Sequence, residues 1–382
     1  MSAQVRPIVL IAALFTLFVS VGSAAPADRG ATFTKAASDA ADTVAREDRF
    51  SGVILVARGD QVLLRKAAGL ADRERNIPNT PKTKFPIYSV TKQFTAAAIM
   101  LLVQDGKVSL EDRISKYYAA SPPAWQDVTI KHLLTHGSGI RDYWVNHPEA
   151  RQALEDGTLF QTHEQLFQLM IGDPLAFAPG TSMSYSNAGY GLLTMVIERA
   201  SGQLYEAFLR DRIFVPLSMH DTGSGSMTGD AAKGYSQSPQ SEWQVVNLDL
   251  VSLGGAGGIY STLDDMLTWS NALDDERLLS VASRTALFTD YGFNYGFGWR
   301  FQTRYGHRLI WHTGNAGPRG GFAAIFNRFP EDNVTVVVLT NNPSLIDYTA
   351  TMTVGGQPLT FQGNAARKVT DQVEQLYFGR AP

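Results

Sequence analysis

Strand-like apolar runs lie near both ends of the chain. Residues 52–57 (GVILVA) are continuously apolar, a polar turn follows at 58–60, and a second β-rich run occupies 61–68. This segment therefore predicts a β-hairpin. Four further β-rich runs follow near the other end of the chain, at 297–302, 308–311, 322–326 and 334–339.

Helical patterns occupy the remaining sequence. Residues 89–104 (SVTKQFTAAAIMLLVQ) predict a helix that is apolar nearly all round, so we expect it to be buried on several faces. From 108 to 278 the pattern changes to short helices and loops broken by prolines. A short amphipathic stretch lies at 36–45, and the pattern at 366–377 predicts a final amphipathic helix.

This order of strands and helices predicts an α+β (αβα) organisation. An αβ module is expected from both chain ends, residues 26–108 and 287–382, with a mainly helical module, residues 109–286, inserted between them. The sequence contains no internal repeat and no long low-complexity linker.

The first 25 residues have the order of a secretory signal peptide. Arg6 precedes an uncharged apolar run at 8–21, and small residues follow at 22–27. The run is shorter than the roughly 20 apolar residues that span a bilayer, which leaves a retained anchor as the weaker alternative. We therefore expect residues 1–25 to be removed, and the mature protein to be periplasmic or secreted without a stable membrane anchor.

Composition narrows the possible chemistry. The 382 residues are 44% hydrophobic, enough for one large core or two medium ones, which excludes disorder of the whole chain. Lys and Arg total 33 against 36 Asp and Glu, so no basic nucleic-acid footprint is present and no nucleic-acid partner is expected. The absence of cysteine excludes disulfides, thiolate metal sites and thiol nucleophiles. Any catalysis must use oxygen and nitrogen side chains.

Ser89 and Lys92 form the only Ser-x-x-Lys in the chain, at the start of the predicted buried helix. Residues three apart share a helix face, so the amine can approach the hydroxyl. Burial disfavours a charged lysine and can make it a base for the serine proton. The alternative is structural, with Ser89 capping the helix and Lys92 extending to solvent.

Two more short segments carry candidate groups. In Tyr185-Ser186-Asn187 the phenol can relay a proton and the amide can hold a substrate carbonyl, although the segment also fits an ordinary turn before a helix. In His312-Thr313-Gly314 the glycine would let a substrate lie against the strand edge beside backbone N–H groups. Its structural alternative is a simple turn at the end of a strand.

In this order the three segments resemble the motifs of the serine β-lactamase and penicillin-binding-protein superfamily. More narrowly, the chain is similar to class C β-lactamases and to the related D-alanyl-D-alanine carboxypeptidases, D-aminopeptidases and esterases. Four further segments are similar to recurrent stretches of that group: 130–140 (IKHLLTHGSGI), 254–265 (GGAGGIYSTLDD), 295–299 (YGFGW) and 320–341. The resemblance implies an antiparallel sheet flanked by helices.

The resemblance also implies roles for individual residues. Ser89 would be the acylated nucleophile, and Lys92 and Tyr185 would share the general-base and general-acid duties. Asn187 would contact the substrate amide, and the backbone N–H groups of Ser89 and Asn315 would form the oxyanion hole. A small-molecule or peptide substrate, with an amide, ester or β-lactam bond, and no metal or other cofactor are expected.

His312 departs from the class C pattern, in which a lysine precedes Thr-Gly. An uncharged imidazole cannot replace a permanent cation near a substrate carboxylate. We therefore expect weak β-lactam hydrolysis and a preference for peptides or esters. Arg319 is a candidate replacement cation. Protonation of His312 below about pH 6.5 is expected to strengthen carboxylate binding.

Other interpretations remain to be compared. His132, His136 and His163 lack the spacing of a zinc-protease motif and are interpreted as structural or surface residues. No Gly-x-Ser-x-Gly occurs. A non-catalytic or slowly turning-over penicillin or cell-wall peptide sensor on the same fold remains the alternative to a hydrolase. The substrate, the oligomeric state and the choice of Lys92 or Tyr185 as main base stay open.

Overall fold

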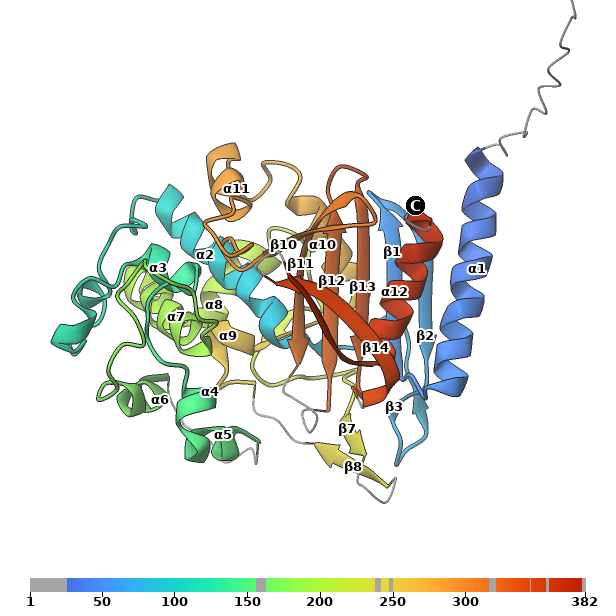
Figure 1. The fold of residues 1–382 in the computed structure, drawn as a ribbon, viewed down its shortest axis with the longest axis horizontal. Helices are drawn as coiled ribbons and strands as arrows, with labels where there is room; N and C mark the ends of the chain where they lie inside the picture. The colour runs from blue at the N-terminus through green and yellow to red at the C-terminus, as the bar shows by residue number, and fades with distance from the viewer. Residues whose placement is uncertain are drawn as a thin grey trace, which may run out of the picture.

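The computed structural model describes residues 26–155, 163–237, 242–246, 250–315, 321–343, 345–354 and 357–379. Its centre is a six-stranded antiparallel sheet in the order β10-β11-β12-β13-β1-β2 (Figure 1). The strands are β1 (Gly52–Arg58), β2 (Gln61–Ala68), β10 (Arg300–Arg304), β11 (His307–Asn315), β12 (Ala323–Phe329) and β13 (Val334–Thr340). The predicted hairpin and the four later runs therefore join one sheet.

Strand β1 explains why both chain ends are needed. It pairs with β13 from Gly52 opposite Thr340 to Arg58 opposite Val334. Val53 and Leu55 belong to the core shared with the helical side of the molecule, whereas Ile54 and Val56 belong to a second core. Because side chains alternate across a strand, a strand covered on both faces has the continuous apolar run seen in the sequence.

Two terminal helices cover the second face. Helices α1 (Pro26–Glu47) and α12 (Ala365–Phe378) lie side by side over the sheet (Figure 1). Val369 and Val373 of α12 are fully buried in the second core. The amphipathic stretch at 36–45 lies within α1, and the helix predicted at 366–377 is confirmed within one residue at each end.

The opposite face carries α2 (Thr91–Gln104) and the mainly helical part of the chain (Figure 1). The remaining helices and helical turns are η1 (Tyr88–Val90), η2 (Ile114–Lys116), η3 (Pro123–Trp125), α3 (Ile130–Leu134), α4 (Tyr143–Asn146), α5 (Pro148–Glu155), α6 (His163–Met170), α7 (Asn187–Ser201), α8 (Tyr205–Leu209), η4 (Arg210–Phe214), α9 (Gly254–Gly257), α10 (Leu263–Ala272) and α11 (Val281–Leu287). The α+β class with a helical insertion is confirmed. The module boundaries at 108 and 287 stay a prediction.

Four smaller sheets complete the described chain. They are β3 (Leu70–Asp72) with β4 (Ile77–Pro78), β5 (Phe85–Pro86) with β9 (Ile259–Ser261) and β6 (Gly223–Ser224), β7 (Gly234–Gln237) with β8 (Trp243–Val246), and β14 (Leu345–Val354) with β15 (Gln357–Asn364). The sequence patterns did not predict the β14–β15 pair.

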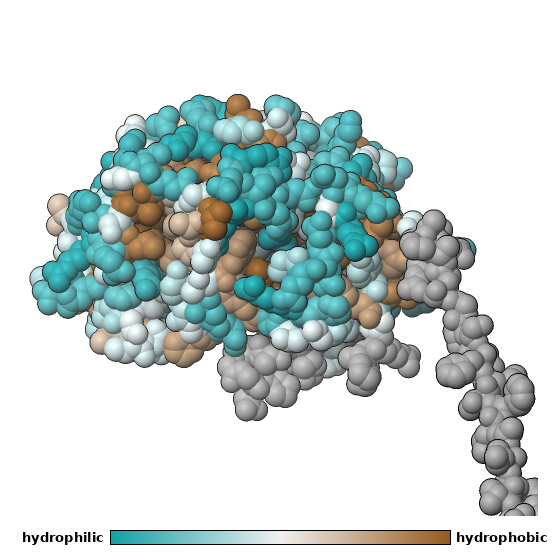
Figure 2. Space-filling view, turned by 90° about the horizontal axis from the view of Figure 1, so that it is seen from above, coloured by the Kyte–Doolittle hydropathy of each residue, from teal (hydrophilic) through white to brown (hydrophobic). Residues whose placement is uncertain are grey.

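The surface seen from above in Figure 2 is largely hydrophilic, with smaller apolar areas between. Within the described ranges, none of the helices combines the length and the apolar character needed to cross a membrane. The predicted signal peptide, residues 1–25, lies outside the described residues.

Candidate active site

Ser89 lies in the helical turn η1, immediately before α2. Helix α2 begins at Thr91, and its N-cap residue is Val90, without a side-chain capping bond. The structural alternative in which Ser89 caps the helix is therefore wrong. Tyr88 has a φ of +44°, a conformation that costs a bulky residue strain and is held here by a fully packed side chain.

Lys92 is completely buried and reaches Ser89 directly. Its Nζ donates to Ser89 Oγ at 3.1 Å, to Asn187 Oδ1 at 2.9 Å and to the Ala256 carbonyl at 2.7 Å. The alternative of an amine extended to solvent is wrong. Burial lowers the pKa of Lys92 from 10.5 to about 7; Asp142 opposes this shift and Arg300 adds to it. A large share of the amine is therefore neutral near neutral pH.

The glycine-rich segment 254–258 supplies one of these partners. It forms the single-turn helix α9. A Cβ at Gly255 would lie 2.7 Å from Thr194 Oγ1 and 2.9 Å from the Tyr190 carbonyl. Glycine therefore allows this turn to approach α7 closely and to present the Ala256 carbonyl to Lys92.

Tyr185 lies beside the same amine. Lys92 Nζ is 4.8 Å from the centre of the Tyr185 ring. Burial raises the pKa of Tyr185 well above its ordinary value, although Ser89 and Arg300 act to lower it. The phenol therefore stays protonated near neutral pH, which suits a proton relay better than a base.

Asn187 is fixed by the start of α7. Ser186 is the N-cap residue, and its Oγ accepts a hydrogen bond from Gly189 N. Asn187 N donates to Asp142 Oδ2 at 2.5 Å, which leaves the side-chain amide directed to Lys92. Asp142 is a residue that the sequence analysis did not identify.

The third segment lies within β11, so its structural alternative, a simple turn at the end of a strand, is wrong. Gly314 pairs with Ala324 of β12, and a Cβ on it would lie 2.1 Å from the Ile87 carbonyl and 2.9 Å from Ser89 N. Only glycine lets this strand pack against the turn that carries Ser89. Thr313 and Asn315 flank that contact, whereas Arg319 lies outside the described residues.

His312 is buried between aromatic groups. Its Nδ1 is 2.7 Å from the Thr313 carbonyl and its Nε2 is 3.3 Å from the Tyr295 hydroxyl. Burial lowers the pKa of His312 well below 6.5, and Arg300 and Lys92 lower it further. The expected protonation near pH 6.5 is therefore wrong, because the ring is desolvated beside two cationic side chains.

His136 is more closely tied to the site than the sequence suggested. Its ring centre is 4.4 Å from that of Tyr185 and 4.7 Å from that of Tyr295, and its Nδ1 accepts from Ser186 N. His132 instead takes part in the N-terminal capping box of α3. The segments 130–140 and 295–299, already notable in the sequence, thus supply the packing around Tyr185.

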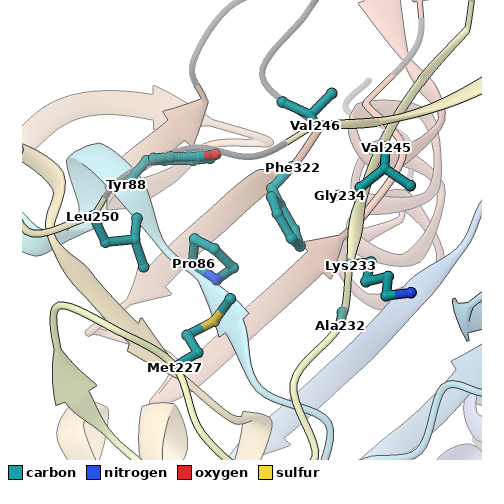
Figure 3. A pocket seen from close by; sticks show the side chains of 10 residues that line it. All are labelled: Pro86, Tyr88, Met227, Ala232, Lys233, Gly234, Val245, Val246, Leu250 and Phe322. Carbon is teal, nitrogen blue, oxygen red and sulfur yellow. The ribbon is translucent and has the colours of Figure 1, made fainter. Parts of the chain in front are cut away.

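An apolar cavity of about 200 Å³ adjoins the residue that precedes Ser89 (Figure 3). Its lining residues are Pro86, Tyr88, Met227, Ala232, Lys233, Gly234, Val245, Val246, Leu250 and Phe322. Tyr88 and Phe322 meet edge to face at 6.4 Å between ring centres. Within the described part of the chain, no group of three or more His, Asp or Glu residues could hold a metal ion.

The sequence of this chain is similar to those of known proteins. The family described as "Beta-lactamase" matches residues 36–354. Penicillin-binding protein 4* of Bacillus subtilis is 27% identical over 376 residues, covering 89% of this chain and 80% of that protein. A D-aminopeptidase of Brucella ovis is 29% identical over 304 residues, covering 76% of this chain but only 56% of its own length.

The structure of this chain is also similar to a solved structure. The D-amino acid amidase of Ochrobactrum anthropi SV3, complexed with D-phenylalanine, superposes with a TM-score of 0.73 at 26% identity, covering 91% of this chain and 99% of that one.

Proposed function

The chain belongs to the beta-lactamase family, and on that basis we propose that it is a serine hydrolase that cleaves amide or ester bonds through an acyl intermediate on Ser89. The observation that carries the proposal is the buried Lys92 amine, 3.1 Å from Ser89 Oγ and with its pKa lowered to about 7. A neutral amine at that distance can accept the hydroxyl proton.

The acylation step uses groups that already touch one another. Lys92 accepts the Ser89 proton while Oγ bonds to the substrate carbonyl carbon, and the carbonyl electron pair moves onto oxygen. The backbone N–H of Ser89, beside β11, and that of Asn315 stabilise this oxyanion. As the oxyanion collapses, the C–N or C–O bond breaks, and the leaving group takes the proton from Lys92 through the Tyr185 phenol.

Deacylation repeats these steps with water in place of the Ser89 hydroxyl. Lys92 accepts a proton from water through Tyr185 while the water oxygen attacks the acyl carbon. Ser89 leaves with a proton, which restores the starting state. Asn187 holds the Lys92 amine through its Oδ1 and leaves its amide N–H₂ for the substrate carbonyl.

We further propose that peptides, amides or esters are better substrates than β-lactams. His312 is a neutral side chain where class C enzymes have a lysine, and the similar proteins named above include a D-aminopeptidase and a D-amino acid amidase. The apolar cavity beside Tyr88 is suited to an apolar substrate side chain. Replacing Val245 with Trp would fill it and should shift the preference toward substrates with smaller side chains.

The test is intact mass and turnover of the same preparation. Wild type, Ser89→Ala and the control Ser201→Ala are exposed to a fluorophosphonate and to a penicillin. They are then assayed on D-amino acid amides, D-Ala-type peptides, short p-nitrophenyl esters and a chromogenic cephalosporin. Labelling and multiple turnover in the wild type and the control, both lost in Ser89→Ala, support the hydrolase. A stable adduct without turnover supports a sensor instead, and fast cephalosporin hydrolysis contradicts the weak β-lactam activity.

We also propose that the protein is exported and acts in the periplasm or outside the cell. The order of charged, apolar and small residues before Asp28 supports this. N-terminal sequencing of the mature protein should find a start between residues 25 and 27; a mature chain that retains Met1 contradicts export by cleavage.

A further inference from the structure

Asp142 lies immediately before α4 and contacts the starts of two helices. Its backbone carbonyl accepts hydrogen bonds from Val145 N and Asn146 N of α4 and from the Asn146 side-chain amide. Its carboxylate accepts from Asn187 N, in the first residue of α7, at 2.5 Å. The residue is only 8% exposed. The buried carboxylate therefore binds one of the N–H groups that a helix N-terminus leaves without an intrahelical partner.

The chain on both sides of Asp142 is anchored to one neighbouring segment. Arg141 Nε donates to the Pro174 carbonyl at 3.1 Å, and Nε2 of His147, which follows α4, is 2.8 Å from Asp173 Oδ2. The residues before and after α4 are thus bound to two adjacent residues. The position of the carboxylate is therefore determined by contacts outside the catalytic groups, as expected for a residue that positions others.

Asn187 connects this carboxylate to the catalytic lysine. Its backbone N–H bonds to Asp142, while its Oδ1 accepts from Lys92 Nζ at 2.9 Å. One residue therefore separates the carboxylate from the amine that donates to Ser89 at 3.1 Å. Opposite charges attract appreciably over such a separation in buried surroundings. Burial lowers the pKa of Lys92 most, Asp142 acts to raise that pKa, and Arg300 acts to lower it.

Other titratable groups surround this pair of charges. Burial lowers the pKa of two histidines well below 6.5 and raises the pKa of four tyrosines above 10, so none of these six rings is charged near neutral pH. Together with the one arginine, the groups are Arg300, His136, His312, Tyr143, Tyr185, Tyr190 and Tyr295. Among the groups that act on the Lys92 amine, Asp142 is the acidic one.

We propose that Asp142 is a positioning residue of the hydrolase. Its carboxylate holds the start of α7 so that Asn187 faces Lys92, and its negative charge favours the protonated form of the amine. The inference rests on the proposed function and assigns its proton balance to two residues of opposite charge, Asp142 and Arg300. The balance matters because Lys92 accepts a proton from Ser89 and then returns one to the leaving group, so neither form of the amine can be strongly disfavoured.

Asp142→Asn separates the two roles, because the amide keeps an acceptor for Asn187 N and removes the charge. The measurement is kcat/KM between about pH 5 and 9 on the best ester or amide of the panel. In Asp142→Asn the midpoint of the profile should move to lower pH, while kcat/KM at high pH stays within about tenfold of the wild type. Asp142→Ala loses the acceptor as well and should lose about 10- to 100-fold in kcat/KM at high pH. Adding Arg300→Met to Asp142→Asn should bring the midpoint back toward that of the wild type.

Asp127→Asn is the control, because Asp127 is an exposed aspartate that pairs with Arg113. Its pH profile should match that of the wild type, and circular dichroism with urea unfolding checks the fold of every variant. A midpoint that stays in place or moves to higher pH in Asp142→Asn overturns the proposal. A purely structural Asp142 would change stability or kcat without moving the midpoint.

Failure of the proposed function would give a different pattern, in which no substrate is turned over and a fluorophosphonate does not label Ser89. NMR of isotope-labelled lysine then measures the protonation of the amine directly, with the Lys92 signal assigned by its loss in Lys92→Met. A lower midpoint in Asp142→Asn than in the wild type supports the role of Asp142. An unchanged or higher midpoint rejects it.

Discussion

Strand β10 contributes one arginine to each of two groups of charged residues, and the two groups differ in whether their charges are paired. The α12 cluster joins Arg304 of β10 to Asp371 and Glu374 of α12, and Asn327 Nδ2 donates to Glu374 at 2.5 Å. The catalytic cluster contains Lys92, which donates to Ser89, together with Arg300, which lies over the Tyr185 ring, and Asp142, which accepts from Asn187 N. In the first cluster acids and bases are paired. In the second, Lys92 contacts neutral oxygen atoms and Arg300 contacts aromatic rings.

The difference in pairing distinguishes charges that stabilise the fold from charges that take part in the chemistry. A buried charge without a partner is costly, so charges that serve only the fold are expected to be paired. Lys92 instead meets the cost by losing part of its positive charge, which is the property that a base needs. The following predictions test this contrast, beginning with the largest effect.

Replacing Lys92 with Met should reduce kcat/KM by about 10³-fold or more, because Ser89 loses the group that accepts its proton. Steady-state kinetics on the best ester or amide of the panel measure the effect, and circular dichroism checks the fold. Lys35→Met is the matched control, since Lys35 is an exposed lysine paired with Asp39 on α1. If the Lys92→Met protein stays active, a group other than Lys92 must accept the Ser89 proton.

Replacing Arg304 with Met should act on the fold alone. It removes the cation that Asp371 and Glu374 share, while Asp371 keeps Arg367 and Glu374 keeps the Asn327 amide. Buried Glu374 loses its cationic partner, so the free energy of unfolding should fall by about 3 kcal/mol. Urea unfolding measures this loss, and kcat at a temperature where the variant stays folded should match the wild type. A large fall in kcat with unchanged stability would contradict the separation of the two clusters.

The pH profile should report the base. Lys92 must be neutral to act, so kcat/KM should rise with pH through about 7 and then level off. Arg300 contributes to the lowered pKa of Lys92, and its removal in Arg300→Met should therefore move the midpoint to higher pH. A midpoint that moves down, or a profile without a step between about pH 6 and 8, is inconsistent with this role.

The last prediction is that the His312 ring does not change its protonation state. Its NMR signals, in protein with labelled imidazoles, should not shift between about pH 5.5 and 7.5. His147 is an internal control: burial lowers its pKa, but the carboxylates of Asp173 and Glu149 outweigh burial and leave a net rise. If the His312 signal follows that of His147, the expectation from the sequence was correct after all.

Local patterns predicted much of the fold. The hairpin of β1 and β2, the later strands and helix α2 follow from short runs whose length and turn residues are properties of neighbouring positions. The β14–β15 pair was missed although residues 346–354 (IDYTATMTV) alternate apolar and polar side chains, which is the pattern of a half-buried strand. The pairing is also local, since Val354 lies opposite Gln357, so the signal for this pair was present in the sequence.

The site divides in the same way. Ser89 and Lys92 could be predicted as a pair, because two residues that are three apart in a helical segment share a face and therefore lie close together. Asp142 lies 45 residues along the chain from Asn187. Arg300 lies far along the chain from Lys92 and Tyr185, although close to His312, and belongs to none of the three motifs, so no motif spacing pointed to either residue. The low pKa of His312 depends on burial and on Arg300, neither of which its own segment reveals.

The pairing of β1 with β13 also determines when this protein can fold. Gly52 meets Thr340, so the central sheet cannot close until almost the whole chain has left the ribosome. Contacts of such high sequence separation form slowly and late. During synthesis the hairpin at the N-terminal end therefore lacks its neighbour. If the protein is exported as proposed above, a chain that stays open in this way would still be unfolded when it is translocated.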